Sequence, residues 1–306
     1  MRQPQPPAID MTQPRQSITL DGHQLIYTTA GDPAAPLLLM LHGWMSYRGV
    51  WRQTIAALQD RYYCVAVDLL GCGDSDKPDE ADYSLPAQGK RVLQLADALA
   101  RGQFALIGHS MGGQIALCIA SMLAPHRVER VISVSGVVAA RLCPSVENVN
   151  YKFIALSRVF PQLFAVLRWL AQYRQVVCSP LSGFKTWFYR TDAVPFEDWA
   201  LDRDMAFQPQ AARAAYRAGQ AIHALDLTSQ LGRITAPTLA IFGRQDAVVP
   251  VSDGQLVAQR VPHGRLTLIN ECGHFPMYEK TQQYLAVVQT FLSDSNSSRS
   301  HPISLS

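Results

Sequence analysis

Short, unbroken apolar segments recur along the chain and constrain its fold more than any other feature. They cover residues 37–41, 63–67, 104–107, 131–134, 238–242 and 265–269. Strands buried on both faces of a sheet have this unbroken pattern, whereas half-exposed strands alternate between apolar and polar residues. Sequences of helical character separate several of the segments, including residues 50–59 and 85–100. This alternation predicts an α/β fold with a mostly parallel central sheet and helices on both of its faces.

The remaining segments complete the expected organisation. Residues 18–29 alternate in polarity around Asp21-Gly22, which predicts a β-hairpin with a tight turn. The strand pattern stops between residues 137 and 228, so we expect a helical insertion there, over a core of residues 17–136 and 229–293, with a last helix near 284–292. Residues 1–16, rich in Pro and Gln, and residues 294–306, rich in Ser, are expected to be disordered tails.

Composition limits the class of protein. Of the 306 residues, 48% are apolar and 17% are charged, which excludes wholesale disorder. A net charge of +3 without a Lys/Arg block argues against a nucleic-acid binder. Neither a signal peptide nor a membrane-spanning segment of roughly 18 apolar residues is evident. The six cysteines contain no Cys-x-x-Cys pair, so we expect free thiols and a soluble, cytoplasmic protein.

The segment Gly108-His109-Ser110-Met111-Gly112 lies between a predicted strand and the apolar helical sequence 114–120. A serine on a sharp strand-to-helix turn has strained backbone, and glycines two residues before and after it remove side chains that would clash. Such a turn raises the Ser110 hydroxyl above the sheet at a helix N-terminus, where the N–H of Met111 and the helix dipole can stabilise an oxyanion. We therefore predict that Ser110 is a nucleophile rather than a solvated serine of an ordinary turn.

A serine nucleophile needs a base that takes its proton and an acid that orients this base. His274 follows the last predicted strand in a loop bounded by Gly273 and Pro276, at the strand ends where active-site groups of open α/β sheets collect. Asp246 follows the preceding predicted strand in the same way. The other position considered for the acid, after the strand that ends near Val134, contains no carboxylate. We predict His274 as the base and Asp246 as the acid that orients it.

Several segments together resemble the α/β-hydrolase fold family, in particular its serine esterase- and lipase-like branch with a helical cap. They are Leu41-His42-Gly43-Trp44, the segment from Asp68 to Asp76, the Ser110 turn, the Asp246 loop and the His274 loop, and they have the family's chain order of Ser, Asp and His. The resemblance implies that the Gly43 loop supplies a second oxyanion-binding N–H from Trp44, and that His42 shapes this loop. Asp68, Asp74 and Asp76 are expected to fix turns. Cys72 departs from the family pattern of a larger or basic residue, and we interpret it as a packing variant.

The nucleophile also narrows the chemistry within this family. Dehalogenases and epoxide hydrolases have aspartate at the turn, whereas a serine implies attack on an acyl group. The first hypothesis is hydrolysis of carboxylic esters with a hydrophobic portion through an acyl-enzyme. Alternatives are hydrolysis of a C–C bond in a diketone-type substrate with the same three residues, cofactor-free perhydrolysis, or, in another class, a ligand-binding protein or receptor that retains the fold. No metal-ligand cluster or dinucleotide motif is evident, so no metal or cofactor is expected.

The predicted insertion has a biased composition. Residues 148–191 contain no acidic residue, and aromatic residues interleave with the cations Lys152, Arg158, Arg168, Arg174, Lys185 and Arg190. A cap that packs its aromatic side chains onto an apolar cleft and points its cations to water explains this pattern. A basic amphipathic lid that touches an anionic membrane surface, or a lipophilic anionic substrate, explains it as well. Both interpretations favour a substrate with a hydrophobic acyl or alcohol portion.

Overall fold

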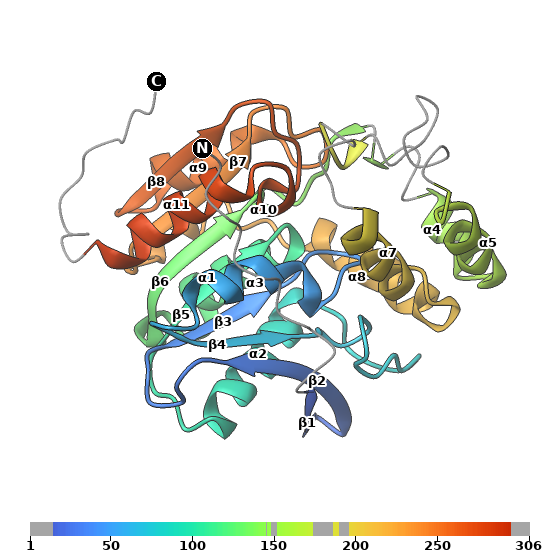
Figure 1. The fold of residues 1–306 in the computed structure, drawn as a ribbon, viewed down its shortest axis with the longest axis horizontal. Coiled ribbons are helices and arrows are strands. Elements are labelled where there is room, and N and C mark those ends of the chain that lie inside the picture. The colour runs from blue at the N-terminus through green and yellow to red at the C-terminus, as the bar shows by residue number, and fades with distance from the viewer. Residues whose placement is uncertain (1–14, 145, 148–151, 174–185, 190–195, 295–306) are drawn as a thin grey trace.

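A computed structural model of the protein describes residues 15–144, 146–147, 152–173, 186–189 and 196–294. Within them, strands form one sheet in the order β1-β2-β4-β3-β5-β6-β7-β8 (Figure 1). β1 pairs antiparallel with β2 and β2 with β4, and all further pairings are parallel. This confirms the predicted fold class. The strands are β1 Arg15–Leu20, β2 His23–Ala30, β3 Leu37–Leu41, β4 Tyr63–Val67, β5 Phe104–His109, β6 Val128–Val134, β7 Thr238–Gly243 and β8 Gly264–Ile269.

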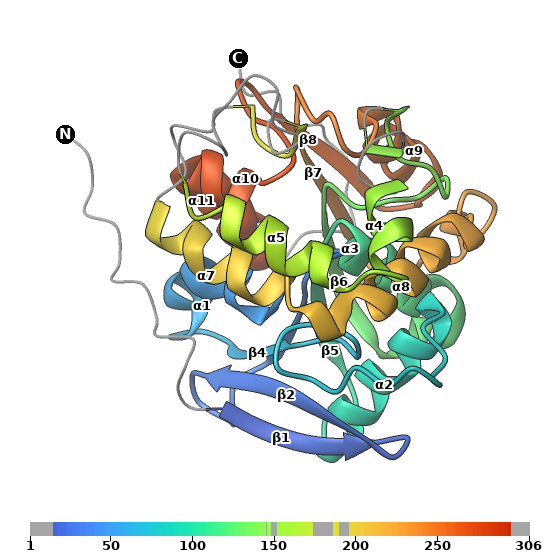
Figure 2. The same cartoon turned by 90° about the vertical axis from the view of Figure 1, so that its right-hand side faces the viewer.

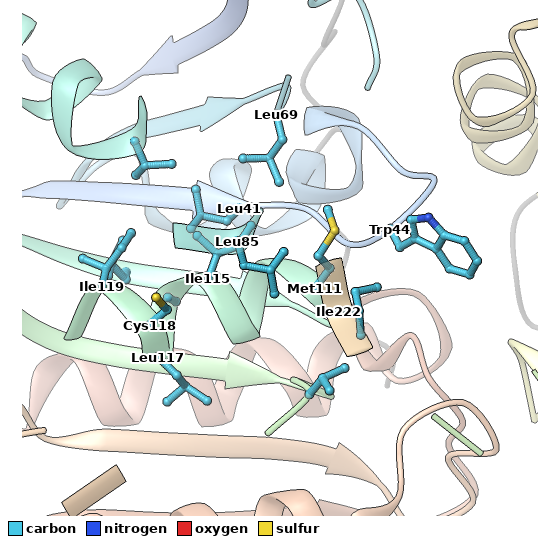
Figure 3. Close-up of a cluster of buried hydrophobic side chains, with 14 of the residues drawn as sticks. Leu41, Trp44, Leu69, Leu85, Met111, Ile115, Leu117, Cys118, Ile119 and Ile222 are labelled. Atoms are coloured by element: carbon cyan, nitrogen blue, oxygen red, sulfur yellow. The ribbon is translucent and has the colours of Figure 1, made fainter. Parts of the chain in front are cut away.

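The central strands bury side chains on both faces, as their unbroken apolar sequences predicted. Every residue of β3, β4 and β5 is buried. Within β3, Leu39 and Leu41 belong to the hydrophobic cluster on one face, and Leu38 and Met40 belong to the cluster on the other. Successive side chains of a strand point to opposite faces, so each central strand contributes to two cores. Figure 3 shows part of the first cluster, where Leu41 lies among side chains of the helix that follows Ser110.

Helices cover both clusters. The cluster around Leu39 includes residues of α2 (Leu85–Ala98), α3 (Met111–Cys118) and α9 (Val251–Arg260). The cluster around Leu38 includes residues of α1 (Arg52–Leu58) and α11 (Thr281–Ser293). Short helical segments extend or connect these elements, namely η1 Arg48–Trp51, the π-helical η2 Ile119–Leu123, η3 Pro125–Arg127, η8 Leu231–Arg233 and α10 Pro276–Glu279. The sheet is therefore a layer between two helical layers.

The chain between β6 and β7 contains helices in its described part. They are α4 Lys152–Ser157, α5 Gln162–Leu170, α7 Phe196–Ala206, η7 Pro209–Ala211 and α8 Ala212–Ala224. An isolated antiparallel bridge joins Ala139 to Asp226, so this segment leaves and re-enters the core at one place. In both views α7 and α8 lie nearer the sheet, and α4 and α5 lie farther out (Figures 1 and 2). That residues 137–228 form a cap remains our proposal.

The ends of the chain differ slightly from the expectation. Arg15 and Gln16 pair with Thr28 and Tyr27 in β1, so the expected tail 1–16 is too long by these two residues, because the hairpin extends to them. Asp294 accepts a hydrogen bond from Arg265 at 3.0 Å. Residues 1–14 and 295–306 lie outside the described residues.

Two further expectations concern cysteines and membrane spans. Cys64, Cys72, Cys118, Cys143 and Cys272 are free thiols, and Cys178 lies outside the described part of the chain. Of the helices that the structure describes, none combines the length and the apolar character needed to cross a membrane.

Candidate active site

Ser110 lies at the turn between β5 and α3, with a backbone conformation of φ 54° and ψ −116°. A non-glycine residue at such a positive φ is strained, and the surrounding structure must hold it there. Its N–H donates to the carbonyl oxygen of Val134 on β6 at 2.9 Å, and its carbonyl oxygen accepts from the N–H of Gln114 at 3.1 Å. The side chain of Ser110 is therefore presented at a fixed place at the carboxyl ends of β5 and β6.

The glycines on either side make this turn possible. A Cβ atom at Gly108 would lie 2.2 Å from the carbonyl oxygen of Gly112. A Cβ atom at Gly112 would lie 2.2 Å from the carbonyl oxygen of Leu41, at the end of β3. Both separations are far below van der Waals contact, and the clashing atoms are backbone atoms. The turn thus brings α3 against the end of β3 at a distance that only glycine permits.

Asp246 and His274 meet at the ends of β7 and β8. The Nδ1 atom of His274 lies 3.1 Å from Oδ1 and 3.0 Å from Oδ2 of Asp246, and both side chains are fully buried. Oδ1 of Asp246 also accepts from the N–H groups of Val248 and Val249, at 2.9 and 3.0 Å. A carboxylate can only accept, so the proton of the neutral imidazole is on Nδ1 and the lone pair is on Nε2.

The Nε2 atom of His274 is buried and has no hydrogen-bond partner in the described structure. No hydrogen bond joins it to the hydroxyl of Ser110 among the described contacts, although catalytic hydrogen bonds are often long before a substrate binds. His274 is held through its backbone instead. Its N–H donates to the carbonyl oxygen of Trp187 at 3.2 Å, and its carbonyl oxygen accepts from Nε2 of His109 at 2.9 Å.

The two N–H groups expected to bind an oxyanion belong to Met111, the first residue of α3, and Trp44, in the loop after β3. Within the described residues, neither N–H donates a hydrogen bond to a protein acceptor. The loop of Trp44 approaches the turn closely, because a Cβ atom at Gly43 would lie 3.1 Å from Cβ of Ser110. The indole of Trp44 donates to the carbonyl oxygen of Ala215 on α8 at 2.7 Å. This bond ties the loop to the segment between β6 and β7.

His42 and Asp68 lie behind this loop and shape it. Nδ1 of His42 donates to the carbonyl oxygen of Gly43 at 2.8 Å, and Nε2 accepts from the N–H of Leu69 at 3.0 Å. Burial lowers the pKa of His42, so the ring is neutral, as this bonding pattern requires. Asp68 is buried and forms an ion pair with Arg48. These contacts agree with the expected structural roles of both residues.

The turn-fixing roles expected for Asp74 and Asp76 agree with their contacts too. Asp74 pairs with Arg48 at 3.0 Å, and Asp76 accepts from the N–H of Gln24 on β2 at 2.7 Å. Asp74 and Asp76 thus attach the segment after β4 to its neighbours. Cys72, in the same segment, is buried.

His109 is a site residue that the sequence reasoning missed. It is buried, its ring centroid lies 4.7 Å from that of His274, and it holds the carbonyl oxygen of that residue. Burial, together with the neighbouring His274, keeps the pKa of His109 well below its usual range. The available signal was its position beside Ser110, which places its side chain at the same edge of the sheet.

Aromatic rings also gather around His274. The ring centroid of Trp187 lies 5.9 Å from that of His274. The ring centroid of Phe275 lies 4.6 Å from that of His109. Phe275 stacks on Phe188 at 5.0 Å and on Tyr278 at 5.8 Å. The surroundings of the His274 ring are therefore apolar and aromatic on the sides that these rings cover.

A buried polar network connects α7 to this aromatic group. Asp202 of α7 accepts from Arg52 of α1 at 3.0 Å and from the hydroxyl of Tyr278 at 2.6 Å. Arg52 also donates to the hydroxyls of Tyr278 and Tyr47, at 3.1 and 2.9 Å. α7 is thus attached to the core beside the His274 loop. Among the described residues, no three His, Cys, Asp or Glu side chains gather in a way that could hold a metal ion.

A comparison with known proteins identifies the family. A family model described as the alpha/beta hydrolase fold matches residues 36–281, which is most of the chain. The chain belongs to the alpha/beta hydrolase fold family. This confirms the family resemblance proposed from the sequence, and the match extends from just before β3 to the start of α11.

Individual proteins that are similar to the chain narrow the class of activity. A pimeloyl-[acyl-carrier protein] methyl ester esterase of Aeromonas hydrophila is 28% identical over 260 residues, spanning 84% of this chain and 95% of the relative. A monoacylglycerol lipase of Bos taurus is 24% identical over 292 residues, spanning 90% and 81%. The crystal structure of a membrane phospholipase A superposes with a TM-score of 0.73 at 27% identity, covering 91% of this chain and 85% of the other. The protein is accordingly an enzyme, a hydrolase of the esterase and lipase type.

Proposed function

We propose that the protein hydrolyses carboxylic esters through Ser110, His274 and Asp246. Oγ of Ser110 attacks the ester carbonyl carbon while its proton passes to Nε2 of His274. The N–H groups of Met111 and Trp44 donate to the oxyanion that forms. His274 then gives its proton to the departing alcohol, which leaves an acyl-enzyme. A water molecule, deprotonated by His274, attacks this ester and releases the acid and the free Ser110 hydroxyl.

The observation that carries this proposal is the pairing of Asp246 with His274 next to an Nε2 atom without a partner. A buried polar atom that makes no hydrogen bond costs free energy, about 1–3 kcal/mol, unless another group uses it. The hydroxyl of Ser110 would donate a hydrogen bond to this Nε2 atom when a substrate is bound. The carboxylate fixes the tautomer in which Nε2 accepts a proton, and this is the state that a general base must have.

The surroundings of the site support a substrate with a hydrophobic portion. Trp187 and Phe275 contact the ring of His274, and Met111 and Trp44 are buried beside Ser110. Apolar surroundings of this kind bind acyl or alcohol groups through burial of surface, about 25 cal/mol per Å². The esterase and lipase names of the relatives favour an ester over the C–C bond of the alternative hypothesis.

The decisive experiment combines a covalent probe with a substrate series. A fluorophosphonate should label the wild-type protein and fail to label Ser110→Ala. A series of p-nitrophenyl esters of increasing acyl length should be hydrolysed by the wild type, with a preference for longer chains, and Ser110→Ala should lose this activity. Ester turnover that persists in Ser110→Ala would exclude the mechanism.

The same assay separates the alternatives. Faster turnover of a vinylogous diketone than of any ester would favour C–C bond hydrolysis by the same residues. Peroxide-dependent halide oxidation would indicate perhydrolysis. Failure of the probe to label Ser110, without turnover of any ester, would favour a ligand-binding protein with the hydrolase fold.

A further inference from the structure

Helix α5 is apolar on two faces, although it lies at the surface of the molecule. Its inner face packs into the protein through Phe164, whose ring meets that of Phe207 edge-on at 5.8 Å, and through Leu167. Its outer face exposes Val166 and Trp169. A helix that is hydrophobic on all sides is normally buried. The outer face of α5 is therefore suited to contact something outside the chain.

The exposed apolar residues of the described chain concentrate at this place. Six of the nine large hydrophobic side chains that are exposed lie within residues 156–173. We call this set the α4–α5 face, and it consists of Leu156 (51% exposed), Val159 (60%), Phe160 (54%), Val166 (50%), Trp169 (55%) and Tyr173 (45%). Val166, Trp169 and Tyr173 are spaced so that they share one side of the helix and its C-terminal extension. Trp169 and Tyr173 also contact each other edge-on, with ring centroids 5.5 Å apart. Soluble monomers rarely gather many exposed apolar side chains within one short segment without a function.

The segment that contains the α4–α5 face carries only positive charges. Lys152 and Arg158 are exposed, and no acidic residue occurs between residues 148 and 191. The guanidinium of Arg158 lies over the ring of Tyr216 at 4.7 Å, which fixes it near the surface. The neighbouring carboxylate of Asp204 on α7 is 3.3 Å from Nε of Arg168 and 2.8 Å from Nε of Arg203, so it is occupied by two cations. A partner with apolar and anionic groups would complement this composition.

We propose that the α4–α5 face binds the surface of an anionic lipid bilayer. Tyr and Trp side chains favour the boundary between lipid headgroups and acyl chains, and Lys and Arg side chains next to them pair with anionic headgroups. The arrangement of the helices permits this contact, because α4 and α5 lie at the outer edge of the molecule, with α7 and α8 between them and the sheet (Figures 1 and 2). The contact is peripheral and needs no membrane-spanning helix.

Vesicle flotation tests the proposal with the full chain. The wild type should float with phosphatidylglycerol vesicles at low salt. It should float less with pure phosphatidylcholine vesicles, and less with the phosphatidylglycerol vesicles at 0.5 M salt, where exposed charges are screened. Phe160→Gln/Trp169→Gln should weaken binding to the phosphatidylglycerol vesicles by about tenfold or more, because two aromatic side chains no longer enter the interface. Lys152→Glu/Arg158→Glu should weaken it to a similar extent at low salt only.

Met122→Gln is the matched control. Met122 is 41% exposed and is the one exposed large hydrophobic residue of the described chain that lies outside the segment between β6 and β7. This variant should float like the wild type, and all variants should keep the melting temperature of the wild type within a few degrees. Absence of wild-type binding to phosphatidylglycerol vesicles, or equal binding by Phe160→Gln/Trp169→Gln, would overturn the proposal.

Two further measurements separate this proposal from other possibilities. Ser110→Ala should float like the wild type, so binding can succeed even if ester hydrolysis through Ser110 is wrong. Light scattering should show the same mass for the wild type and for Phe160→Gln/Trp169→Gln. A wild-type dimer that this substitution converts to a monomer would show that a second copy covers the face, and would overturn the assignment to lipid.

Discussion

The carboxylate of Asp246 faces three groups in the candidate active site. Oδ1 accepts from the N–H groups of Val248 and Val249, and both oxygens face Nδ1 of His274. An asparagine can still accept from the two N–H groups, but it presents an NH₂ group that favours the wrong imidazole tautomer. We expect Asp246→Asn to lower kcat for a p-nitrophenyl ester by about a thousandfold or more while the fold stays intact.

Steady-state kinetics and a thermal melt of the purified variant check this prediction. Glu271→Gln is the control, because this carboxylate is 66% exposed and lies in the loop just before His274. It should keep wild-type kinetics. A loss smaller than about tenfold in Asp246→Asn would mean that another group orients the base.

His109 contacts the proposed base, His274, through its backbone. Its Nε2 holds the carbonyl oxygen of His274, and its ring packs against Phe275. We expect His109→Leu, which lacks a donor, to lower kcat about tenfold with little change in KM, because the base is displaced rather than the substrate site. His109→Gln can donate from a similar position and should recover most of the activity. Equal losses in the two variants, or a change confined to KM, would contradict a positioning role.

At the scale of elements, the contact between α3 and β3 depends on the absence of one side chain. A Cβ atom at Gly112 would lie 2.2 Å from the carbonyl oxygen of Leu41 and 2.5 Å from that of His42. Neither backbone can move without disturbing the sheet, so we expect Gly112→Ala to lower the free energy of unfolding by about 3 kcal/mol or more. Gly102→Ala is the control, since a Cβ atom there has no neighbour within 4 Å. Urea unfolding measures both variants, and similar midpoints would refute the steric argument.

The attachment of α7 to the core depends on a buried ion pair. Asp202 contacts Arg52 at 3.0 Å, with side-chain exposures of 14% and 3%. Removing one partner of a buried pair costs about 3–5 kcal/mol, whereas exposed pairs contribute about 0–1 kcal/mol. We therefore expect Asp202→Asn to destabilise the protein by about 2–4 kcal/mol. It should also increase proteolytic cleavage between β6 and β7.

Asp204→Asn provides the comparison for the attachment of α7. Asp204 lies on the same helix, is 40% exposed, and pairs with Arg168 and Arg203. Its substitution should change the free energy of unfolding by less than about 1 kcal/mol. If both variants are equally stable and equally resistant to protease, the Arg52 network does not hold α7.

At the scale of the whole molecule, the sequence predicted the sheet well and the contacts between distant segments poorly. The strands β3 and β4 have the predicted bounds, because unbroken apolar runs end abruptly at polar or glycine residues. The region predicted as one helix over residues 50–59 is instead η1 followed by α1. The helical segment already begins at Arg48, whose backbone N–H donates a hydrogen bond to Asp68. Local patterns contain enough information for such elements.

The residues of the candidate site also differ in how well the sequence predicts them. Ser110 and its glycines are visible in the sequence because their spacing follows from the local turn. The pairing of Asp246 with His274 was proposed from their positions after late strands, and the structure places the two side chains together. By contrast, Arg52 and Tyr278 are separated by 226 residues, and no sequence pattern relates them. His109 was missed because its partner is a backbone carbonyl group, which every residue has.

Two buried imidazoles also link the stability of the protein to pH. Burial lowers the pKa of both His42 and His109 from 6.5. Below about pH 6.5 the unfolded chain therefore binds protons that the folded protein does not, and stability falls as the pH falls. Each histidine contributes a slope of up to about 1.4 kcal/mol per pH unit until its folded pKa is reached. His109→Gln should show a shallower loss of unfolding free energy than the wild type between pH 6.5 and 5, and identical slopes would contradict this account.

This proton linkage implies that acid inactivates the protein slowly, through loss of its folded state. Loss of the folded state through His42 and His109 develops with the unfolding rate, and aggregation can make it permanent. Activity that is recovered after a brief exposure to pH 5 and lost after a long one would show that unfolding of the buried interior sets the acid limit of the protein.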